Sequence, residues 1–250
     1  MPTSLSSDKF SQRCELGIVA TIPHFAIAEM LKLSALDWVW IDAEHGGFDA
    51  QSAAAFCAVI SGAKKTYVRI PDKSETSVQK FLDIGADGII VPMVNSEDEV
   101  DQICCSACYP PIGKRSVGIA RAHAYGVNFK NYLNQRSYKI TIQIETAEAV
   151  DRIDQIVAHK EIDEIFIGPY DLSGSLGCLG EVTSNMVQNK IETILNACKK
   201  VKKSCGIFAG STESCLKYKQ MGFEKIAISL DTLLFNQALT QCLDLVKNKD

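Results

Sequence analysis

The chain has 250 residues, of which 46% are hydrophobic and 22% are charged, and its formal net charge is −4 at pH 7. This composition excludes an intrinsically disordered chain, because apolar residues are plentiful and the net charge is small. The slight acidity gives no general attraction to nucleic acid or to anionic membranes. No run of about 18 apolar residues occurs that could span a bilayer, and Met1–Glu15 lacks the apolar stretch of a signal peptide. We therefore expect a cytoplasmic protein.

Short runs rich in β-branched and aromatic residues recur along the chain, with helical periodicity between them. We expect eight strands, at Leu16–Ala20, Trp38–Asp42, Thr66–Ile70, Gly88–Val91, Thr141–Glu145, Glu164–Gly168, Gly206–Ala209 and Lys225–Leu230. Apolar residues three and four positions apart predict amphipathic helices between these strands. Ser96 and Glu99 have the spacing of a capping box, and Thr146 and Ser211 are predicted N-cap residues.

The alternation of strands and helices predicts parallel strands joined by helical crossovers. Eight such units in 250 residues match the usual size of a (β/α)8 TIM barrel, so we expect residues 1–250 to form one α/β domain of this fold. A doubly wound open sheet is the alternative, but no G-x-G-x-x-G motif follows the first strand. The longest insertion, about residues 107–137, contains two adjacent prolines and is expected to lie partly over one end of the barrel.

Ten cysteines raise the question of disulfides or a zinc site. Several fall within helix-like apolar patterns, where a free cysteine behaves as a small hydrophobe. The segment Cys104–Cys108 contains a C-x-x-C spacing, yet no second cysteine or histidine pair lies near it to complete a tetrahedral site. Reduced thiols are therefore expected.

Polar residues at the C-terminal ends of the strands are the first candidates for a site, because barrel enzymes place their chemistry there. The strand that ends in Asp42 runs directly into Glu44 and His45. A carboxylate next to the ring, with Asp42 as a candidate, would orient His45 and raise its basicity, as a general base requires. A purely structural histidine is the alternative. Arg69 closes the next strand, and a buried guanidinium needs an anionic partner, either Glu145 or a substrate oxyanion.

Two acidic residues close the fifth and sixth predicted strands. Period two places Gln143 and Glu145 on the inward face of the fifth strand, and Asp171 follows the sixth. Neighbouring strands lie about 4.8 Å apart, and two carboxylates at such a distance repel each other unless a proton or a cation lies between them. A divalent cation with oxygen ligands would fit. The alternative is that each carboxylate caps the helical turn that follows it.

No lysine stands at the C-terminal end of a predicted strand, which disfavours a Schiff-base mechanism.

Six segments occur in order at or near the predicted strand ends: Trp38–Asp49 (WVWIDAEHGGFD), Tyr67–Pro71 (YVRIP), Leu82–Met93 (LDIGADGIIVPM), Tyr109–Gly118 (YPPIGKRSVG), Ile142–Ala147 (IQIETA) and Phe166–Gly177 (FIGPYDLSGSLG). Through them, the chain resembles the HpcH/HpaI class II pyruvate aldolases over about residues 15–240.

The resemblance implies a (β/α)8 barrel whose last helix is exchanged between subunits, giving dimers that assemble into a hexamer, a trimer of dimers. It also implies a carbon–carbon lyase that uses a divalent metal (Mg, Mn or Co). The implied reaction is reversible retro-aldol cleavage of a 4-hydroxy-2-oxo acid to pyruvate and an aldehyde. The substrate would be of the 2-keto-3-deoxy sugar acid or the 2,4-dihydroxyhept-2-enedioate type.

Residue roles follow from the resemblance at matching positions. Glu145 and Asp171 resemble the metal ligands, Arg69 the group that stabilises the enolate oxygen, and His45 the catalytic base or its partner. Asp83 resembles a residue that supports the histidine of a neighbouring subunit's site. The residues expected to contact the substrate are Gln143, Gly168, Pro169, Tyr170 and Ser173. Backbone N–H groups around Tyr170–Asp171 are expected to bind the substrate carboxylate.

The sequence departs from the family pattern at Ser116, where relatives usually have glycine, and this affects the expected aldehyde preference. In the same insertion, Arg115, Arg121, His123 and Tyr125 are candidates for binding a polar or anionic substrate tail, with solvated surface positions as the alternative for at least two of them. Two other functions stay open. A citrate-lyase-β-type thioester lyase would need a basic patch near the mouth, and a non-catalytic barrel would serve assembly or binding alone.

Overall fold

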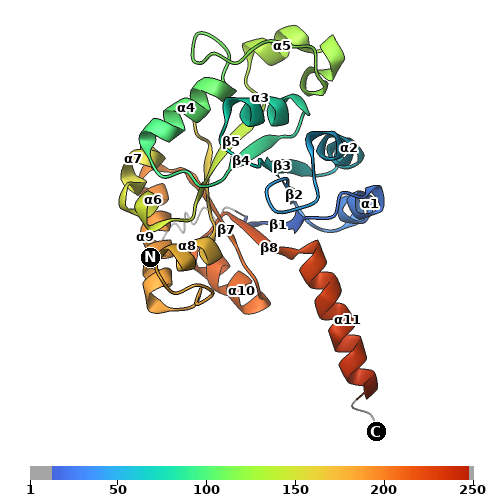
Figure 1. Ribbon diagram of the computed structural model, residues 1–250, viewed down its shortest axis with the longest axis vertical. Helices are drawn as coiled ribbons and strands as arrows, with labels where there is room; N and C mark the ends of the chain where they lie inside the picture. The colour runs from blue at the N-terminus through green and yellow to red at the C-terminus, as the bar shows by residue number, and fades with distance from the viewer. Residues whose placement is uncertain (1–12, 248–250) are drawn as a thin grey trace, which may run out of the picture.

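In the computed structural model, residues 13–247 are described, and their strands form one closed barrel in which each strand pairs in parallel with its neighbours in chain order (Figure 1). The strands are β1 (Glu15–Ala20), β2 (Trp38–Asp42), β3 (Lys65–Arg69), β4 (Gly88–Val91), β5 (Lys139–Ile144), β6 (Glu164–Ile167), β7 (Ser204–Phe208) and β8 (Lys225–Leu230). The predicted α/β barrel is confirmed. The prediction about a signal peptide concerns Met1–Glu15, of which residues 1–12 lie outside the described part.

Helices alternate with the strands, and all but the last lie around the barrel (Figure 1). They are α1 (Phe25–Leu33), α2 (Ala50–Ile60), α3 (Glu75–Asp83), α4 (Glu97–Ala107), the 3-10 helix η1 (Arg121–Gly126), α5 (Phe129–Asn134), α6 (Ala147–Asp151), α7 (Ile153–Ala158), α8 (Pro169–Ser175), α9 (Asn185–Val201), α10 (Thr212–Met221) and α11 (Asp231–Lys247). No helix within residues 13–247 is long and apolar enough to cross a membrane.

The predicted helix caps are largely confirmed. The side chains of Thr146 and Ser211 accept hydrogen bonds from the first turns of α6 and α10. Ser96 caps α4 in the same way by accepting from the backbone N–H of Glu99. The carboxylate of Glu99, however, accepts from the N–H of Asn95 and pairs with Lys73. Only half of the predicted capping box is therefore formed.

Aromatic rings fill the lower half of the barrel. The rings of Trp38, Tyr67 and Phe166 meet edge to face, with Trp38 at 6.0 Å from Tyr67 and 5.9 Å from Phe166. A glycine on the adjacent strand makes room for them, because a Cβ on Gly17 would lie 2.3 Å from the Trp38 ring. This packing closes the N-terminal end of the barrel, so any site must lie above it, at the C-terminal ends of the strands.

A buried ion pair lies among these rings. Lys225 Nζ is 2.9 Å from Glu164 Oε2, and the side chains are 5% and 2% exposed. The same ammonium group lies 3.9 Å from the centre of the Tyr67 ring, a cation–π distance. Lys225, the first residue of β8, therefore stands at the end of the barrel opposite the mouth.

Replacing Lys225 with methionine is expected to lower the free energy of unfolding by about 3–5 kcal/mol, because the change leaves the Glu164 carboxylate buried without its partner. Urea denaturation measures this effect. A second substitution, Glu164→Leu, should recover most of the loss, since replacing both partners removes the unpaired charge. A single variant as stable as the wild type would contradict this view of the ion pair.

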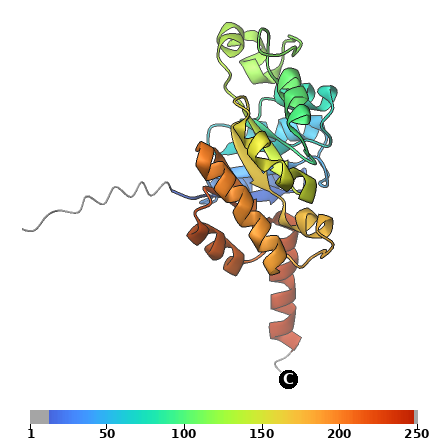
Figure 2. The ribbon, with the colours of Figure 1, turned by 90° about the vertical axis from the view of Figure 1, so that its left-hand side faces the viewer.

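The long insertion packs on the outer side of α3 and α4 (Figure 2). The backbone N–H of Lys114 donates to Cys105 O in α4, and Arg121 Nη1 donates to Ile84 O and Gly85 O, in the loop that enters β4. Some of its residues reach the N-terminal end of the barrel, where Ala122 and Tyr132 line a surface hollow. None of its described side chains lines the cavity at the mouth.

The last helix, α11, begins directly after β8 and extends away from the barrel (Figures 1 and 2). None of its residues is buried, although one side of the helix carries large apolar residues. They are Phe235 (68% exposed), Leu239 (48%) and Leu243 (46%). Its base is held by Asp231, whose carboxylate accepts from the N–H and hydroxyl of Thr21 at the end of β1. These contacts fix the direction in which the helix leaves the barrel.

All ten cysteines are free thiols, as expected. Burial raises the pKa of Cys57 to about 11 and that of Cys104 to about 12. Cys104 Sγ lies 3.8 Å from His159 Nδ1, but no three histidine, cysteine, aspartate or glutamate side chains within residues 13–247 form a group that could hold a metal ion. The buried thiols therefore act as packing groups.

Candidate active site

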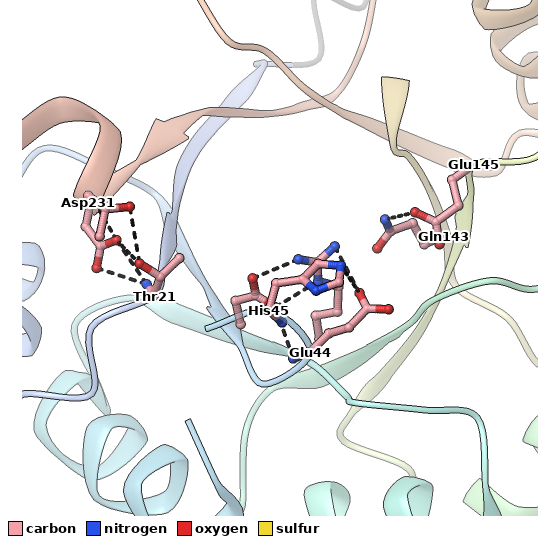
Figure 3. A network of polar contacts seen from close by, with 9 residues as sticks. Thr21, Glu44, His45, Gln143, Glu145 and Asp231 are labelled. Carbon is pink, nitrogen blue, oxygen red and sulfur yellow. Dashed lines mark hydrogen bonds and ion pairs between the residues drawn. The ribbon is translucent and has the colours of Figure 1, made fainter. Parts of the chain in front are cut away.

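The C-terminal ends of the strands surround a cavity of about 160 Å³. Figure 3 shows Gln143 beside Glu145 in one part of this region and Glu44 beside His45 in another. The lining residues come from strand ends and from the segments that follow them: Val19, Trp40, His45, Arg69, Gln143, Gly168, Pro169, Tyr170, Asp171, Phe208 and Leu230. Residues that the sequence placed at separate strand ends therefore meet around one space.

Arg69, the last residue of β3, is held by two carboxylates. Its Nε and Nη2 donate to the two oxygens of Asp42, at 2.9 and 2.7 Å, and its Nη1 lies 3.1 Å from Glu44 Oε2. The strand register explains the first pair, since Asp42 on β2 lies directly beside Arg69. Burial alone would lower the pKa of Arg69, but Asp42 and Glu44 raise it above the usual value, so the group is always charged. Of the two partners considered for Arg69, Glu145 forms no ion pair with it, because these two nearer carboxylates take that place. The substrate oxyanion stays a prediction.

His45 lies at the rim, with its side chain 69% exposed. Asp42 does not orient its ring. Instead, Asp42 Oδ1 accepts from the backbone N–H groups of Glu44 (3.1 Å) and His45 (3.2 Å) and so fixes the turn after β2. The carboxylate near the ring is that of Glu44, with Oε2 3.7 Å from His45 Nε2. Burial raises the pKa of Glu44, although the charge of Arg69 opposes this effect.

Gln143 and Glu145 form a buried pair at the end of β5. Glu145 Oε1 accepts from the backbone N–H of Met93 at 2.7 Å, and its Oε2 accepts from Gln143 Nε2. Gly168 must be glycine here, because a Cβ would lie 2.9 Å from both Gln143 Nε2 and Glu145 Oε2. The missing side chain lets the start of α8 approach the carboxylate. Gln143 Oε1 is buried and has no hydrogen-bond partner among the described residues.

Neither Glu145 nor Asp171 forms an ion pair with a basic side chain within residues 13–247. Burial raises the pKa of Glu145 to about 7; the hydrogen bond from Met93 opposes this, and the charges of Asp171 and Glu44 add to it. Asp171, in the first turn of α8, lines the cavity. Neither acid caps a helix, since Thr146 caps α6 and α8 has no side-chain cap. The alternative interpretation as caps was therefore wrong.

The oxygen atoms of Glu145, Asp171 and Gln143 are suitable ligands for a hard divalent cation. Two carboxylates and the unpartnered amide oxygen of Gln143 are the oxygen ligands that Mg²⁺ and Mn²⁺ prefer. Because the described residues contain no group of three acidic, histidine or cysteine ligands, substrate and water would have to complete the coordination. An open site of this kind is typical of catalytic rather than structural metals.

A family model described as HpcH/HpaI aldolase/citrate lyase matches residues 21–238. The chain belongs to this family. It is 31% identical, over 98% of its length and 97% of the relative's, to a 5-keto-4-deoxy-D-glucarate aldolase of Citrobacter koseri. It is 34% identical, over 94% of its length and 89% of the relative's, to a 2-keto-3-deoxy-L-rhamnonate aldolase of Shigella sonnei.

A solved structure agrees. The crystal structure of a family protein from Burkholderia cenocepacia J2315 superposes with a TM-score of 0.91 at 29% identity, and the match covers 95% of this chain and 96% of that one. The predicted HpcH/HpaI membership is therefore confirmed, and the chain is an enzyme of an aldolase family.

Four of the predicted site residues do not line the cavity. Asp42 and Glu145 lie next to it and are hydrogen-bonded to the lining residues Arg69 and Gln143, and the other two are Ser173 and Asp83. Ser173 is fully buried, and its hydroxyl donates to Tyr170 O at 2.6 Å and accepts from the N–H of Gly180 at 2.9 Å. Ser173 therefore links α8 to the segment that follows it and does not contact the cavity. Asp83, at the end of α3, pairs with Arg115 at 2.5 Å and does not line its own chain's cavity. Its expected role in a neighbouring subunit stays a prediction.

The insertion residues proposed to bind a substrate tail have other partners. Arg115 is buried against the rings of Tyr109, Tyr132 and Tyr138, at 4.8, 5.7 and 5.2 Å from their centres. Arg121 binds the carbonyls at the entry to β4, and His123 is buried and hydrogen-bonded to backbone. Only Tyr125 is exposed. None of them lines the cavity, so a role in binding the substrate of the same chain is not supported.

Four apolar residues of the cavity were missed because sequence reasoning considered only polar groups at strand ends. They are Val19, Trp40, Phe208 and Leu230. Trp40 had a readable signal, since it lies two residues before Asp42 on the same face of β2. Leu230 had none. The pairing of β8 with β1 shifts between Gly17↔Ala227 and Val19↔Leu230, and this bulge turns Leu230 toward the cavity.

Proposed function

We propose that this enzyme catalyses the divalent-metal-dependent, reversible cleavage of a 4-hydroxy-2-oxo acid to pyruvate and an aldehyde. The observation that carries the proposal is the shared cavity. In it, Asp171 and Arg69 face the same space as the amide of Gln143, which is bonded to Glu145. The names of the relatives favour substrates of the 2-keto-3-deoxy sugar acid type over 2,4-dihydroxyhept-2-enedioate. The cation, Mg²⁺, Mn²⁺ or Co²⁺, would supply Lewis acidity next to the keto group.

The side chains divide the remaining work. Glu145, Asp171 and the amide oxygen of Gln143 would hold the cation. A base must remove the proton of the C4 hydroxyl, and His45 stands at the rim with Glu44 at 3.7 Å to stabilise its protonated form. The C3–C4 bond then breaks, the aldehyde forms at C4, and the electron pair collects on the C2 oxygen as an enolate. Protonation of this enolate at C3, by the protonated base or by water, gives pyruvate. Arg69, fixed by Asp42 and Glu44, presents a permanent positive charge to that oxygen.

The thioester-lyase alternative is disfavoured by the placement of the basic residues it would use. Lys114 pairs with Glu75 at 2.8 Å, and Arg115 is buried under tyrosines beside Asp83. A free basic patch for a CoA phosphate is therefore not formed by these residues at the cavity. A non-catalytic barrel is disfavoured because Arg69 and Asp171 line an open cavity.

The proposal is tested by incubating Mg²⁺-, Mn²⁺- or Co²⁺-loaded protein with pyruvate and a panel of aldehydes, among them hydroxyaldehydes of sugar-acid type and succinic semialdehyde. Formation of a 4-hydroxy-2-oxo acid, lost in chelator and regained with metal, is expected. Product formation that is unaffected by exhaustive chelation, or no product with any pair, would contradict the proposal. Release of an acetyl thioester from a 3-hydroxyacyl thioester, without cleavage of a 4-hydroxy-2-oxo acid, would favour the thioester alternative.

We further propose that α11 packs against a second copy of the chain, within the hexameric trimer of dimers that the family resemblance implies. A helix depends mainly on packing for its stability in water, yet none of the residues of α11 is buried in its own chain. Phe235, Leu239 and Leu243 follow each other at intervals of four and form one apolar stripe. Asp83, 38% exposed and held by Arg115, could then reach a neighbouring site.

The double substitution Leu239→Asp and Leu243→Asp is expected to convert the assembly to smaller species, because two charges would enter the buried stripe. Sedimentation velocity measures the change. Gln241→Asp, on another side of the same helix, is the matched control and should leave the assembly intact. An unchanged sedimentation coefficient in the double variant would show that this face of α11 makes no contact between subunits.

A further inference from the structure

Trp40 is the largest side chain that lines the cavity, and no step described so far uses it. It lies on β2 between Val19 on β1 and Tyr67 on β3, in register with both. Only 3% of the residue is exposed. Its ring meets the ring of Phe166 edge to face, with 4.7 Å between centres and planes at 85°. Packing against Phe166 therefore fixes the orientation of the indole under the cavity.

The face of this ring supports the catalytic arginine. Arg69 Cζ lies 5.1 Å from the centre of the Trp40 ring, within the range of a cation–π contact. Asp42 and Glu44 hold the guanidinium through its N–H groups. Only the indole contacts the flat face of the guanidinium among the described aromatic rings. The hydrogen bonds to the edge of the guanidinium and the indole against its face together determine the position and the orientation of the group.

The indole also carries an unused donor. Trp40 Nε1 is buried and has no hydrogen-bond partner among the described residues. A buried tryptophan N–H normally finds a partner, because leaving it unpaired costs free energy. Gln143, on β5, lines the same cavity, and its Oε1 is an equally unpartnered acceptor. The unpaired N–H, on a residue that lines the cavity, indicates a bound molecule with an oxygen acceptor, whereas the unpaired Gln143 oxygen needs a donor or a cation.

We propose that Trp40 binds and positions the 2-oxo acid, with its indole N–H donating to an oxygen of the substrate while its ring face holds Arg69 against the same molecule. This inference rests on the proposed function and adds a specific contact to it. The two roles separate chemically. The N–H contact exists in the bound ground state, whereas support of Arg69 matters most when charge develops on the C2 oxygen.

Two substitutions separate these roles. Trp40→Phe keeps an aromatic face under Arg69 but removes the donor, so KM for pyruvate in the aldol direction should rise about tenfold, as expected for one lost hydrogen bond. Its kcat should stay within about threefold of the wild type. Trp40→Leu removes the face as well, and its kcat should fall about a further tenfold as Arg69 loses its support. Thermal melts check that both variants fold.

Fluorescence tests the contact independently of turnover. The chain has two tryptophans, and the other one, Trp38, lies lower in the barrel, with its Nε1 3.4 Å from Glu15 O. Titration of the Mg²⁺-loaded enzyme with pyruvate should give a saturable change in tryptophan emission. The change should persist in Trp38→Phe, the matched control, and disappear in Trp40→Phe, whose only tryptophan is Trp38.

The experiments distinguish a failure of this inference from a failure of the proposed function. A wild type that makes no aldol product would contradict the proposed function and this inference with it. A wild type with normal turnover, combined with wild-type KM and kcat in both Trp40 variants, would overturn this inference alone. So would an emission change that persists in Trp40→Phe. In either case the indole N–H of Trp40 would make no contact with the substrate.

Discussion

Replacing Glu145 with glutamine is expected to reduce the rate of pyruvate formation by at least about 10³-fold, because it removes a negative ligand from the proposed cation site. The substitution keeps the shape of the side chain and one acceptor oxygen for Met93 N–H, so the fold should persist. The amide must then meet Gln143, whose Oε1 has no other partner and can accept from it. Stopped assays of pyruvate release and isothermal titration with Mn²⁺ measure the two effects.

The metal titration decides what the loss of rate means. Glu145→Gln and Asp171→Asn should both weaken Mn²⁺ binding by at least about tenfold, whereas loss of a general base would leave it unchanged. Glu148→Gln is the matched control, since Glu148 lies three residues further along on the exposed side of α6 and pairs only with Arg152 at 3.3 Å. Wild-type Mn²⁺ affinity in Glu145→Gln would exclude Glu145 as a ligand.

Replacing Arg69 with lysine is expected to lower kcat by about 10²–10³-fold, the usual effect of removing one preorganised donor from a developing oxyanion. Lysine keeps a charge but cannot reproduce the fork of the guanidinium, which bonds both oxygens of Asp42 and reaches Glu44. The ammonium group would therefore turn toward the carboxylates and away from the substrate. Steady-state kinetics in the cleavage direction measure the loss.

Loss of stability must be separated from loss of catalysis, because any substitution of Arg69 affects its partner Asp42, which is almost fully buried. A second substitution, Arg69→Met, leaves the Asp42 carboxylate without a partner. Adding Asp42→Asn removes that unpaired charge, so the double variant should melt closer to the wild type than Arg69→Met alone. Both should be equally inactive. Arg152→Lys, which changes an exposed arginine in a surface pair, is the matched control and should keep wild-type kcat. An Arg69→Lys enzyme with wild-type kcat would show that Arg69 does not stabilise the enolate.

The barrel and much of its site could be predicted because both follow from local periodicity. Alternating strands and helices specify parallel pairing, and period two on β5 places Gln143 and the following Glu145 on the inner face. Arg69 at the end of β3 could be placed in the mouth for the same reason. Positions fixed by one strand's own sequence are therefore readable from that sequence.

Features that depend on contacts between distant segments could not be predicted. The role of Asp42 depends on which neighbouring strand stands in register, and its oxygens turned out to hold Arg69 and not the His45 ring. Leu230 reaches the cavity only through the bulge between β8 and β1. Arg115 looked like a solvent-exposed or substrate-binding cation, since nothing local shows that two tyrosines of the insertion and Tyr138, just before β5, enclose it.

The most direct test of the account is exchange of the C3 protons of pyruvate with solvent in D₂O, followed by proton NMR without any aldehyde present. Exchange requires a base that removes a C3 proton, which His45 would supply, and a site that stabilises the enolate. It therefore tests Glu145, Asp171 and Arg69 independently of aldehyde preference. We expect the methyl signal of pyruvate to disappear with Mg²⁺- or Mn²⁺-loaded enzyme and to persist after chelation and in Glu145→Gln. A methyl signal that persists with loaded wild-type enzyme, or that decays equally fast after chelation, would contradict the proposed role of a metal-dependent enolate site.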